Sequence, residues 1–349
     1  MSYSTTTSIT NQSDLMSQLS TFAVTTMGWT QDNYDGTLKK MSLHKGTVYV
    51  HFWWDDTSTQ SATYGTSIGM YQSLGFISAG TAVYAHTDDS QNGANSAATL
   101  CNERGIKFIG DGPYTSLHLF GQSSPTDTIY GVLEFAPGLY RHFAFGTLEK
   151  SGTWTGGEFC AGHHWDPENN GADLDNPTGI YHNLLMDAEN YGHAAHPTST
   201  RTHGTLHMEN ITGMITSGNL KWGIAGRCIN MQTAYTLGRD GNARTVLLGG
   251  CRGGFACNLY GWQQPDLTKG FVPIIPCDIW MYEPTATAAE HYYYLGKMPN
   301  MGHVQMRGID PQQAITVGAE TWSAFPGVRK SKVGGNNQES WNMGLIYKQ

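Results

Sequence analysis

The sequence predicts a mainly β protein whose N-terminal part also contains one helix packed on an antiparallel sheet. Short segments rich in β-branched and aromatic residues recur at intervals of roughly 10–12 residues, which is typical of antiparallel sheets and sandwiches. Glycine accounts for 43 of the 349 residues, so the chain has many positions suited to turns. Only one segment shows a strong helical period.

The helix is expected over about residues 14–27. Its apolar side chains recur at the spacing of a single helical face: Leu15, Leu19, Phe22, Ala23 and Met27. Ser13 or Asp14 is expected to cap its N-terminus, and Gly28 to end it. The polar, threonine-rich residues 1–10 are expected to form an arm.

Strands are predicted wherever β-branched and aromatic runs lie between small polar turns. In the N-terminal part these runs are TVYVHFWW, GIKFIG, YTSLHLFG, TIYGVLEFAPG and YRHFAFG. In the C-terminal part they are LKWGIAGRC, ARTVLLGG, FVPIIPCDIWMY, AEHYYYLGKMP and MGLIYK, with a strand, turn and strand in TVGAETWSAFPGVRKS. The stretch SIGMYQSLGF at 67–76 is ambiguous and could form a short second helix. TLEKSGTWTGG is expected to be a hairpin-like connection in which Gly152, Gly156 and Gly157 provide turn conformations.

These elements suggest a division into three segments. Residues 1–155 form an N-terminal domain of helix and antiparallel sheet, and residues 216–349 form a second β-rich, sandwich-like part. Residues 156–215 between them are rich in glycine, asparagine and histidine and poor in aliphatic side chains, so they are expected to form long loops.

Charge and hydropathy exclude several classes of protein. The formal net charge is -8 and no basic cluster stands out, so nucleic acid is not an expected partner. No apolar run approaches the ~18–20 residues that span a bilayer, and the polar N-terminus does not resemble a secretory signal. The protein is therefore expected to be synthesised in a reducing cytoplasm. Its six cysteines form no C-x-x-C pair and are expected to be buried free thiols, the alternatives being a disulfide formed later or a metal site.

Two long blocks of sequence resemble a known group of proteins. The N-terminal block contains DLMSQLSTFAVTTMGWT, LHKGTVYVHF, GPYTSLHLFG and VLEFAPGLYRHFAFGTLEKSGTWTGGEF. The C-terminal block runs from YYYLGKMPNMGHVQMRGIDPQQAITVGAETWSAFPGVRKS to NMGLIYKQ. Together they resemble virion structural proteins encoded in the tail and baseplate regions of tailed bacteriophages, with YRHFAFGTLEKSGTWTGGEF as the most distinctive part. The histidine-rich middle is mostly outside this resemblance.

The resemblance implies a non-enzymatic component of the virion tail, present in many copies. Expected partners are other tail or baseplate proteins and further copies of the chain, in a trimer or hexamer. The alternative is a host-receptor-binding module that contacts a surface glycan or protein through loops 160–215, with Trp165, Tyr181 and Tyr191 as candidate recognition residues. A third, less favoured hypothesis is an enzyme that degrades a bacterial surface polymer.

The middle segment also contains candidate metal ligands. Imidazole is a common ligand for zinc, and the candidates are His163, His164, His193 and His196. Asp166, Glu168 and Asn170 have the spacing of the first ligands of a calcium loop, but Pro177 stands where its bidentate glutamate would be. Ordinary polar loops are favoured over either metal. No cofactor is therefore expected, and a structural zinc or calcium ion is the minority alternative.

Signals for catalysis are weak. The sequence contains no G-x-S-x-G, and Cys160 near His163 is only a proximity in the chain. A glycosidase would need two carboxylates a few ångström apart, which sequence cannot show. The carboxylates considered for such a pair are Glu134, Glu149, Glu158 and Asp187.

Overall fold

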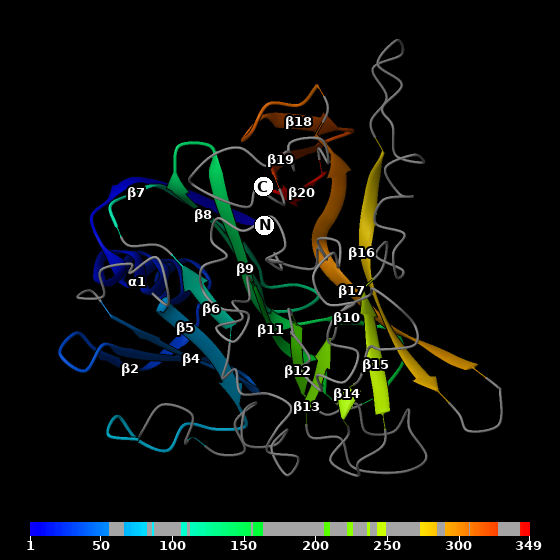
Figure 1. Cartoon of the computed structure of the whole chain (residues 1–349), viewed down its shortest axis with the longest axis horizontal. Coiled ribbons are helices and arrows are strands. Elements are labelled where there is room, and N and C mark those ends of the chain that lie inside the picture. The colour runs from blue at the N-terminus through cyan, green and yellow to red at the C-terminus, as the bar shows by residue number, and fades with distance from the viewer. Residues whose placement is uncertain are drawn as a thin grey trace, which may run out of the picture.

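A computed structural model describes the two ends of the chain and several strands between them. The described residues are 1–55, 66–81, 86, 106–109, 112–154, 156–162, 206–209, 222–225, 236–237, 243–248, 273–284, 290–306, 308–326 and 343–349. The fold is mainly β, as predicted, and these described residues form three antiparallel sheets and one helical segment (Figure 1).

The central sheet has the strand order β1-β7-β8-β9-β11-β12-β13. Its strands are β1 (Ser2–Ile9), β7 (Tyr114–Gln122), β8 (Thr128–Ala136), β9 (Leu139–Thr147), β11 (Glu158–Gly162), β12 (Leu206–Glu209) and β13 (Trp222–Ala225). The N-terminal sheet has the order β2-β3-β4-β5-β6. Its strands are β2 (Thr30–Asp35), β3 (Lys40–Lys45), β4 (Val48–Trp54), β5 (Thr66–Ser73) and β6 (Ile106–Ile109).

The C-terminal sheet has the order β14-β15-β16-β17-β20-β19-β18, and the short β10 pairs with β17 off this path. Its strands are β10 (Glu149–Lys150), β14 (Thr236–Leu237), β15 (Ala243–Leu248), β16 (Ile274–Pro284), β17 (Glu290–Gln305), β18 (Ala314–Val317), β19 (Glu320–Pro326) and β20 (Met343–Lys348). The strand, turn and strand predicted in TVGAETWSAFPGVRKS (316–331) is confirmed as the β18–β19 hairpin, which projects at the top of the molecule (Figure 1).

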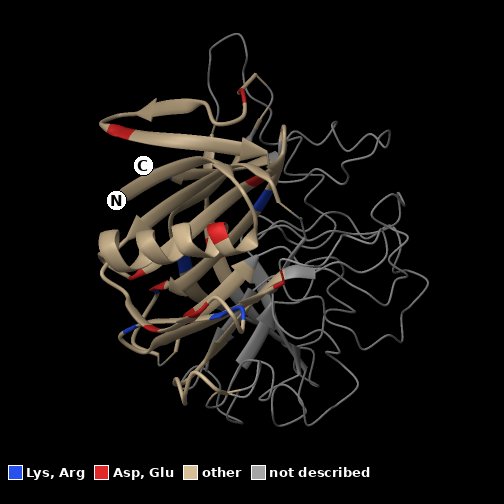
Figure 2. Ribbon diagram, turned by 90° about the vertical axis from the view of Figure 1, so that its left-hand side faces the viewer, with Lys and Arg blue, Asp and Glu red and all other residues tan. Residues whose placement is uncertain are grey.

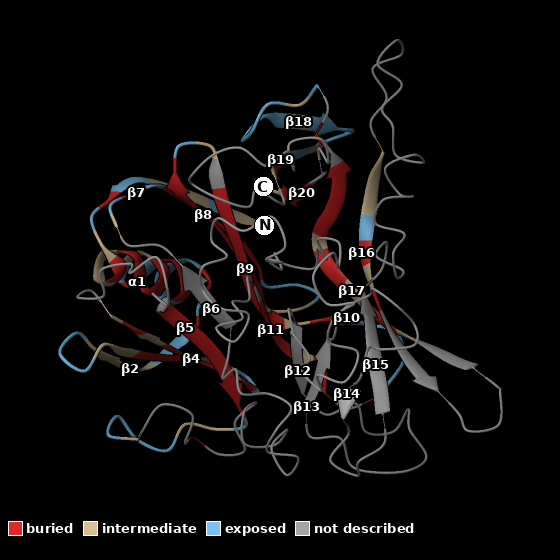
Figure 3. Ribbon diagram, in the orientation of Figure 1, coloured by how far each residue is buried: buried red, intermediate tan, exposed pale blue. Residues whose placement is uncertain are grey.

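The central sheet is the middle layer of the fold, because both of its faces are covered. On β7, Leu117 and Leu119 belong to the apolar cluster that contains the helix and the N-terminal sheet. The alternate residues of the same strand, His118 and Phe120, contact Phe325 on β19. Since successive side chains of a strand point to opposite faces, β7 contributes side chains to the buried regions on both sides of the central sheet. Accordingly β8, β9 and β11 are buried almost throughout, whereas β18 is exposed (Figure 3).

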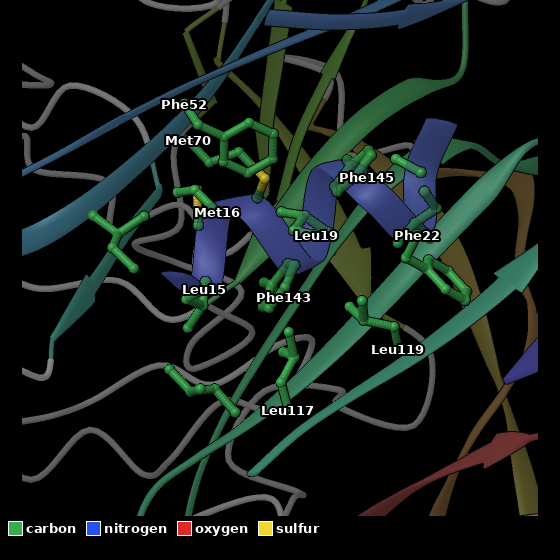
Figure 4. Packing of buried hydrophobic residues seen from close by; sticks show 14 of the residues in the cluster. Leu15, Met16, Leu19, Phe22, Phe52, Met70, Leu117, Leu119, Phe143 and Phe145 are labelled. Carbon is green, nitrogen blue, oxygen red and sulfur yellow. The ribbon is translucent and has the colours of Figure 1, made fainter. Parts of the chain in front are cut away.

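The helical segment comprises α1 (Gln12–Thr21) followed by a short π-helix, η1 (Phe22–Thr26). The predicted apolar face is confirmed, since Leu15, Leu19, Phe22, Ala23 and Met27 are all buried. Figure 4 shows Met16 beside Phe52 and Met70 of the N-terminal sheet, with Leu19 on the side of Phe143 from the central sheet. The helix therefore fills the space between two sheets.

The ends of the helical segment were predicted only in part. Neither Ser13 nor Asp14 is the N-cap; Asn11 holds that position, and its side-chain oxygen accepts from the Asp14 backbone N–H at 2.9 Å. The Asp14 carboxylate in turn accepts from the Thr10 N–H at 2.9 Å, so both residues satisfy donors at the helix start. Gly28 ends the segment as predicted, with a φ of +68° that suits glycine.

Two predictions about individual segments were wrong. Residues 1–10 do not form an arm: β1 pairs along its length with β7, in a register that sets Tyr3 opposite Phe120. The alternating exposure of its side chains and its three consecutive threonines suit a half-exposed outer strand. The alternative of a second helix at 67–76 is also wrong, because β5 lies between β4 and β6 as a strand.

The hairpin-like connection between β9 and β11 is confirmed. The two strands pair antiparallel from Thr147 opposite Glu158, and Gly152, Gly156 and Gly157 all have positive φ. Gly146 just before it also has a positive φ, and a Cβ there would collide with the Asp127 carbonyl oxygen. This part of the chain therefore needs glycine for backbone reasons.

The strands of the central sheet come from all three predicted segments, and β10 joins the C-terminal sheet from the N-terminal segment. The division at 155 and 215 stays a prediction. In the described part of the chain, no helix is long and apolar enough to cross a membrane.

Candidate functional site

The residues predicted for metal binding and recognition lie outside the described residues. This holds for His163, His164, His193 and His196, for Asp166, Glu168 and Asn170, and for Trp165, Tyr181 and Tyr191. Asp187 is also outside them. Among the residues that are described, no group of three or more histidine, cysteine, aspartate or glutamate side chains is placed to hold a metal. The metal and recognition hypotheses therefore stay predictions.

The densest polar cluster that the structure describes lies between the central and C-terminal sheets. Ser116 and His118 on β7 and Glu134 on β8 are all buried, and they share one face because residues two apart on a strand point the same way. Antiparallel register sets Ser116 directly opposite Glu134. Serine, histidine and carboxylate together are the residue types of a nucleophilic triad, so their hydrogen-bond directions are decisive.

The direction of these hydrogen bonds is opposite to that of a triad. The Ser116 hydroxyl donates to Glu134 Oε2 at 2.9 Å, so its oxygen is left to accept from His118 Nε2 at 3.1 Å. We assign the neutral Nε2–H tautomer to His118, and the Tyr3 hydroxyl then donates to Nδ1 at 3.0 Å. Burial lowers the pKa of His118 to about 4, although the Glu134 charge opposes this shift. His118 therefore donates a hydrogen bond to the Ser116 hydroxyl and does not accept its proton, so it does not activate this serine as a nucleophile.

Glu134 is held by several donors. Its Oε1 accepts from the Gly138 N–H at 2.8 Å and its Oε2 from Gln312 Nε2 at 3.2 Å. The same Gln312 nitrogen lies 3.1 Å from the Tyr140 hydroxyl. A buried carboxylate is tolerable when its oxygens are satisfied in this way. Gln312 precedes β18, so the cluster links two layers of the fold.

Buried aromatic and histidine side chains join the same two sheets further along. His142 on β9 donates from Nε2 to the Pro326 carbonyl at 2.9 Å, and its Nδ1 lies 2.7 Å from the Tyr347 hydroxyl. A carbonyl can only accept, so the neutral ring accepts from Tyr347 at Nδ1. The Tyr130 hydroxyl donates to the Pro299 carbonyl at 2.6 Å. These directional bonds fix the C-terminal sheet on the central sheet.

The other described side chains that were considered for catalysis are either buried in the core or bonded to neighbouring side chains. Cys160 is fully buried in the apolar cluster, and burial raises the pKa of its thiol, so the reactive thiolate is disfavoured. Glu149 pairs with Lys297 at 3.2 Å, and Glu158 accepts from the Thr47 hydroxyl at 2.6 Å. Cys160 and Cys277 are buried free thiols, as predicted; the other four cysteines lie outside the described residues.

Sequence reasoning missed the cluster of Ser116, His118 and Glu134 almost entirely. The alternation of Ser116 and His118 on a predicted strand signals a shared face, but nothing local indicates the register that adds Glu134. Comparison with known proteins adds no further assignment: no family model matches the chain, and no curated protein matches it.

Proposed function

We propose that this chain is a non-enzymatic structural component of a bacteriophage tail or baseplate. It assembles with other virion proteins and with further copies of itself, as a trimer or hexamer. The family resemblance of the two ends motivates the tail assignment. The observation that carries the assembly is the character of two outer strands, β1 and β18.

These two strands are unprotected edges. Within the described residues, β1 pairs only with β7 and β18 only with β19. Neither strand contains a charged residue or a proline. Soluble proteins usually guard outer strands with charges, prolines or bulges, because a free edge can pair with another chain. In Figure 2 the hairpin at the top carries an acidic residue on β19, while β18 above it carries no charge.

The outer strand β2 shows the contrast within the same chain. It carries Asp32 and Asp35, and its pairing with β3 is interrupted by an irregularity between Gln31 and Asn33. Both are devices that discourage pairing between edges. Of the three outer strands compared, β2 is therefore guarded and β1 and β18 are not, which supports a partner strand at β1 and β18.

Exposed apolar side chains lie on the same two strands. Val317 on β18 is 45% exposed and Tyr3 on β1 is 38% exposed. Such side chains suit surfaces that are covered in the assembled state. If a neighbouring copy supplies the pairing strand, two different edges meet head to tail, and this kind of contact closes into a ring under rotational symmetry.

The packing of the three sheets against one another is a second observation that supports a structural role. The three sheets share buried cores, and Tyr130 and His142, between the central and C-terminal sheets, donate to backbone carbonyls of the C-terminal part. Satisfied buried networks hold one arrangement of the layers and resist deformation. A rigid body is what a component of a symmetric assembly requires.

Adding a charge to the open edge is expected to weaken self-association. Thr316→Lys places a lysine on exposed β18, and we expect the dissociation constant of the oligomer to rise about tenfold or more, since about 1.4 kcal/mol corresponds to a factor of ten. Sedimentation velocity over a range of concentrations measures this change. The matched control is Thr30→Lys on the guarded strand β2, which should sediment as the wild type does.

The assembly proposal is wrong if the wild-type protein sediments as a monomer and is absent from virions. Release of products from a bacterial surface polymer would favour the enzyme hypothesis instead. Saturable binding to host cells would favour the receptor-binding alternative, whose loops 160–215 lie mostly outside the described residues.

A further inference from the structure

A pair of stacked histidines lies on the outer face of the N-terminal sheet. His51 on β4 and His86 are 1% and 6% exposed, and their rings are parallel within 8° with centroids 4.0 Å apart. Tyr71 on β5 and Phe76 extend this stack, at 4.9 Å from His51 and 5.2 Å from His86 respectively. Two imidazoles in such contact can both be buried only while neither carries a charge.

The hydrogen bonds of His51 define its neutral form. The Ser73 hydroxyl donates to the Gly75 carbonyl at 2.9 Å, so its oxygen accepts from His51 Nε2 at 2.6 Å. His51 Nδ1 then accepts from the Ser42 hydroxyl at 2.9 Å. Each group in this chain of hydrogen bonds donates to the next, from the Ser42 hydroxyl through His51 and Ser73 to the Gly75 carbonyl. His51 can both accept and donate in this way only while its ring is neutral.

His86 is the more sensitive member of the pair. Its Nδ1 accepts the backbone N–H of Ile77 at 3.1 Å. A protonated imidazole carries hydrogens on both nitrogens, so two N–H groups would then face each other. The same proton would also place a positive charge against the His51 ring. Protonation therefore removes the bond that ties residues 74–81 to His86.

The charged groups around the pair do not favour a protonated ring. Lys40 on β3 donates to the Thr81 carbonyl at 3.0 Å, beside the pair. Asp32 on β2 is the facing carboxylate, and it is already bonded to His44 at 2.8 Å. Burial lowers the pKa of His86, Lys40 lowers it further, and Asp32 acts in the opposite direction. Burial and His86 together lower the pKa of His51 well below its usual value.

The pocket around the pair has little room for water that would hydrate an additional charge. Its polar lining consists of Asn33, Lys40, Ser42, Ser78 and Thr81, and no carboxylate of the described residues contributes to it. Its volume of about 10 Å³ is close to the space that one water molecule needs. A proton on His86 is therefore accommodated only if the covering segment moves away.

We propose that His51 and His86 form an acid-operated latch, in which protonation of His86 releases residues 74–81 from the outer face of the N-terminal sheet. Release uncovers His51 and Tyr71 and removes Phe76 from His86, and so presents an aromatic surface that neutral pH keeps closed. The latch is independent of the proposed role in a phage tail, since it depends only on contacts within this sheet.

Hydrogen exchange of the Ile77 amide tests the latch directly. After correction for the intrinsic effect of pH, we expect peptides covering residues 75–81 to lose protection as the pH falls below ~6.5, by at most about tenfold per pH unit, because the open segment takes up one proton on His86 that the closed segment excludes. Peptides from α1 report global unfolding and should still be protected at a pH where 75–81 have lost protection, which separates latch opening from global unfolding.

His86→Asn is the informative variant. The asparagine oxygen can still accept from the Ile77 N–H but cannot take a proton, so protection of 75–81 should persist at pH 5.5. The matched control is His44→Asn on the same sheet face, where Asp32 is the partner, and it should open as the wild type does.

Three outcomes overturn the latch. In the wild type, protection of 75–81 could be the same at pH 7 and pH 5.5, or it could be lost only together with that of α1. In His86→Asn, the loss of hydrogen-exchange protection at 75–81 between pH 7 and pH 5.5 could equal that of the wild type. The first two need no substitution, so the proposal remains testable if His86→Asn does not fold.

Discussion

Acidification from pH 7 to pH 4 is expected to unfold the protein. His118, His142 and His303 are buried between sheets, and burial lowers the pKa of each imidazole to about 4. His118 and His142 are further committed to the neutral form by groups that donate to their Nδ1 atoms. Below pH ~6.5 the unfolded chain takes up protons that the folded chain excludes, so stability falls with pH.

The sign and size of the effect follow from linkage. A histidine whose folded pKa is below its unfolded value costs nothing above pH ~6.5, and its cost grows until the pH reaches the folded value of about 4. A shift of that size corresponds to roughly 3 kcal/mol for each histidine. Three such groups together approach the whole stability of a typical protein, which is ~5–15 kcal/mol.

Urea unfolding at a series of pH values between 7 and 4 measures this loss. His303→Leu isolates one contribution, because within the described part of the chain the buried Nε2 of His303 has no hydrogen-bond partner. We expect the variant to be at least as stable as the wild type at pH 7 and to lose about 3 kcal/mol less by pH 4. A wild type with the same urea midpoint at pH 7 and pH 4 would contradict the prediction.

Leu19→Ala is expected to destabilise the protein by ~2–5 kcal/mol. Leu19 is 0% exposed and lies where α1 meets both the central and the N-terminal sheet (Figure 4). Its removal leaves a cavity that two β layers border, and sheets held by long ladders collapse into such a space only in part. The measurement is the urea midpoint at pH 7, where the buried histidines contribute no pH-dependent loss.

The control for Leu19→Ala is Val24→Ala. Val24 belongs to the same helical segment but is 36% exposed. Its truncation should change stability by no more than about 0.5 kcal/mol, as is usual for surface positions. Equal midpoints for the two variants would show that the buried face of α1 does not support the fold.

Local pattern was sufficient for most elements of the fold. The 3.6-residue period of Leu15, Leu19 and Phe22 predicted the helix face, and β-branched or aromatic runs predicted strands such as β4 and β8. Errors occurred where the pattern was weak. Residues 1–10 have little hydrophobicity, so only the free edge of β7 shows why they become a strand. At 67–76 a short apolar run is compatible with both helix and strand.

The same limit applies to the candidate sites. Ser116 and His118 could be placed on one face of a strand from their spacing alone. The carboxylate that completes their cluster is 18 residues away, and the direction of its hydrogen bond decides that the serine is not a nucleophile. His51 and His86 lie in different elements, and no period connects them.

By itself the sequence determined most strands of the described residues, the amphipathic helix and the glycines at the β9–β11 connection. These features depend on residues that are close together in the chain, so their spacing can be read directly from the sequence. Only the tertiary structure decided which face of each strand meets which layer, which edges stay open and which histidines are kept neutral. Those properties depend on register and burial, which arise when residues far apart in the chain exclude water together.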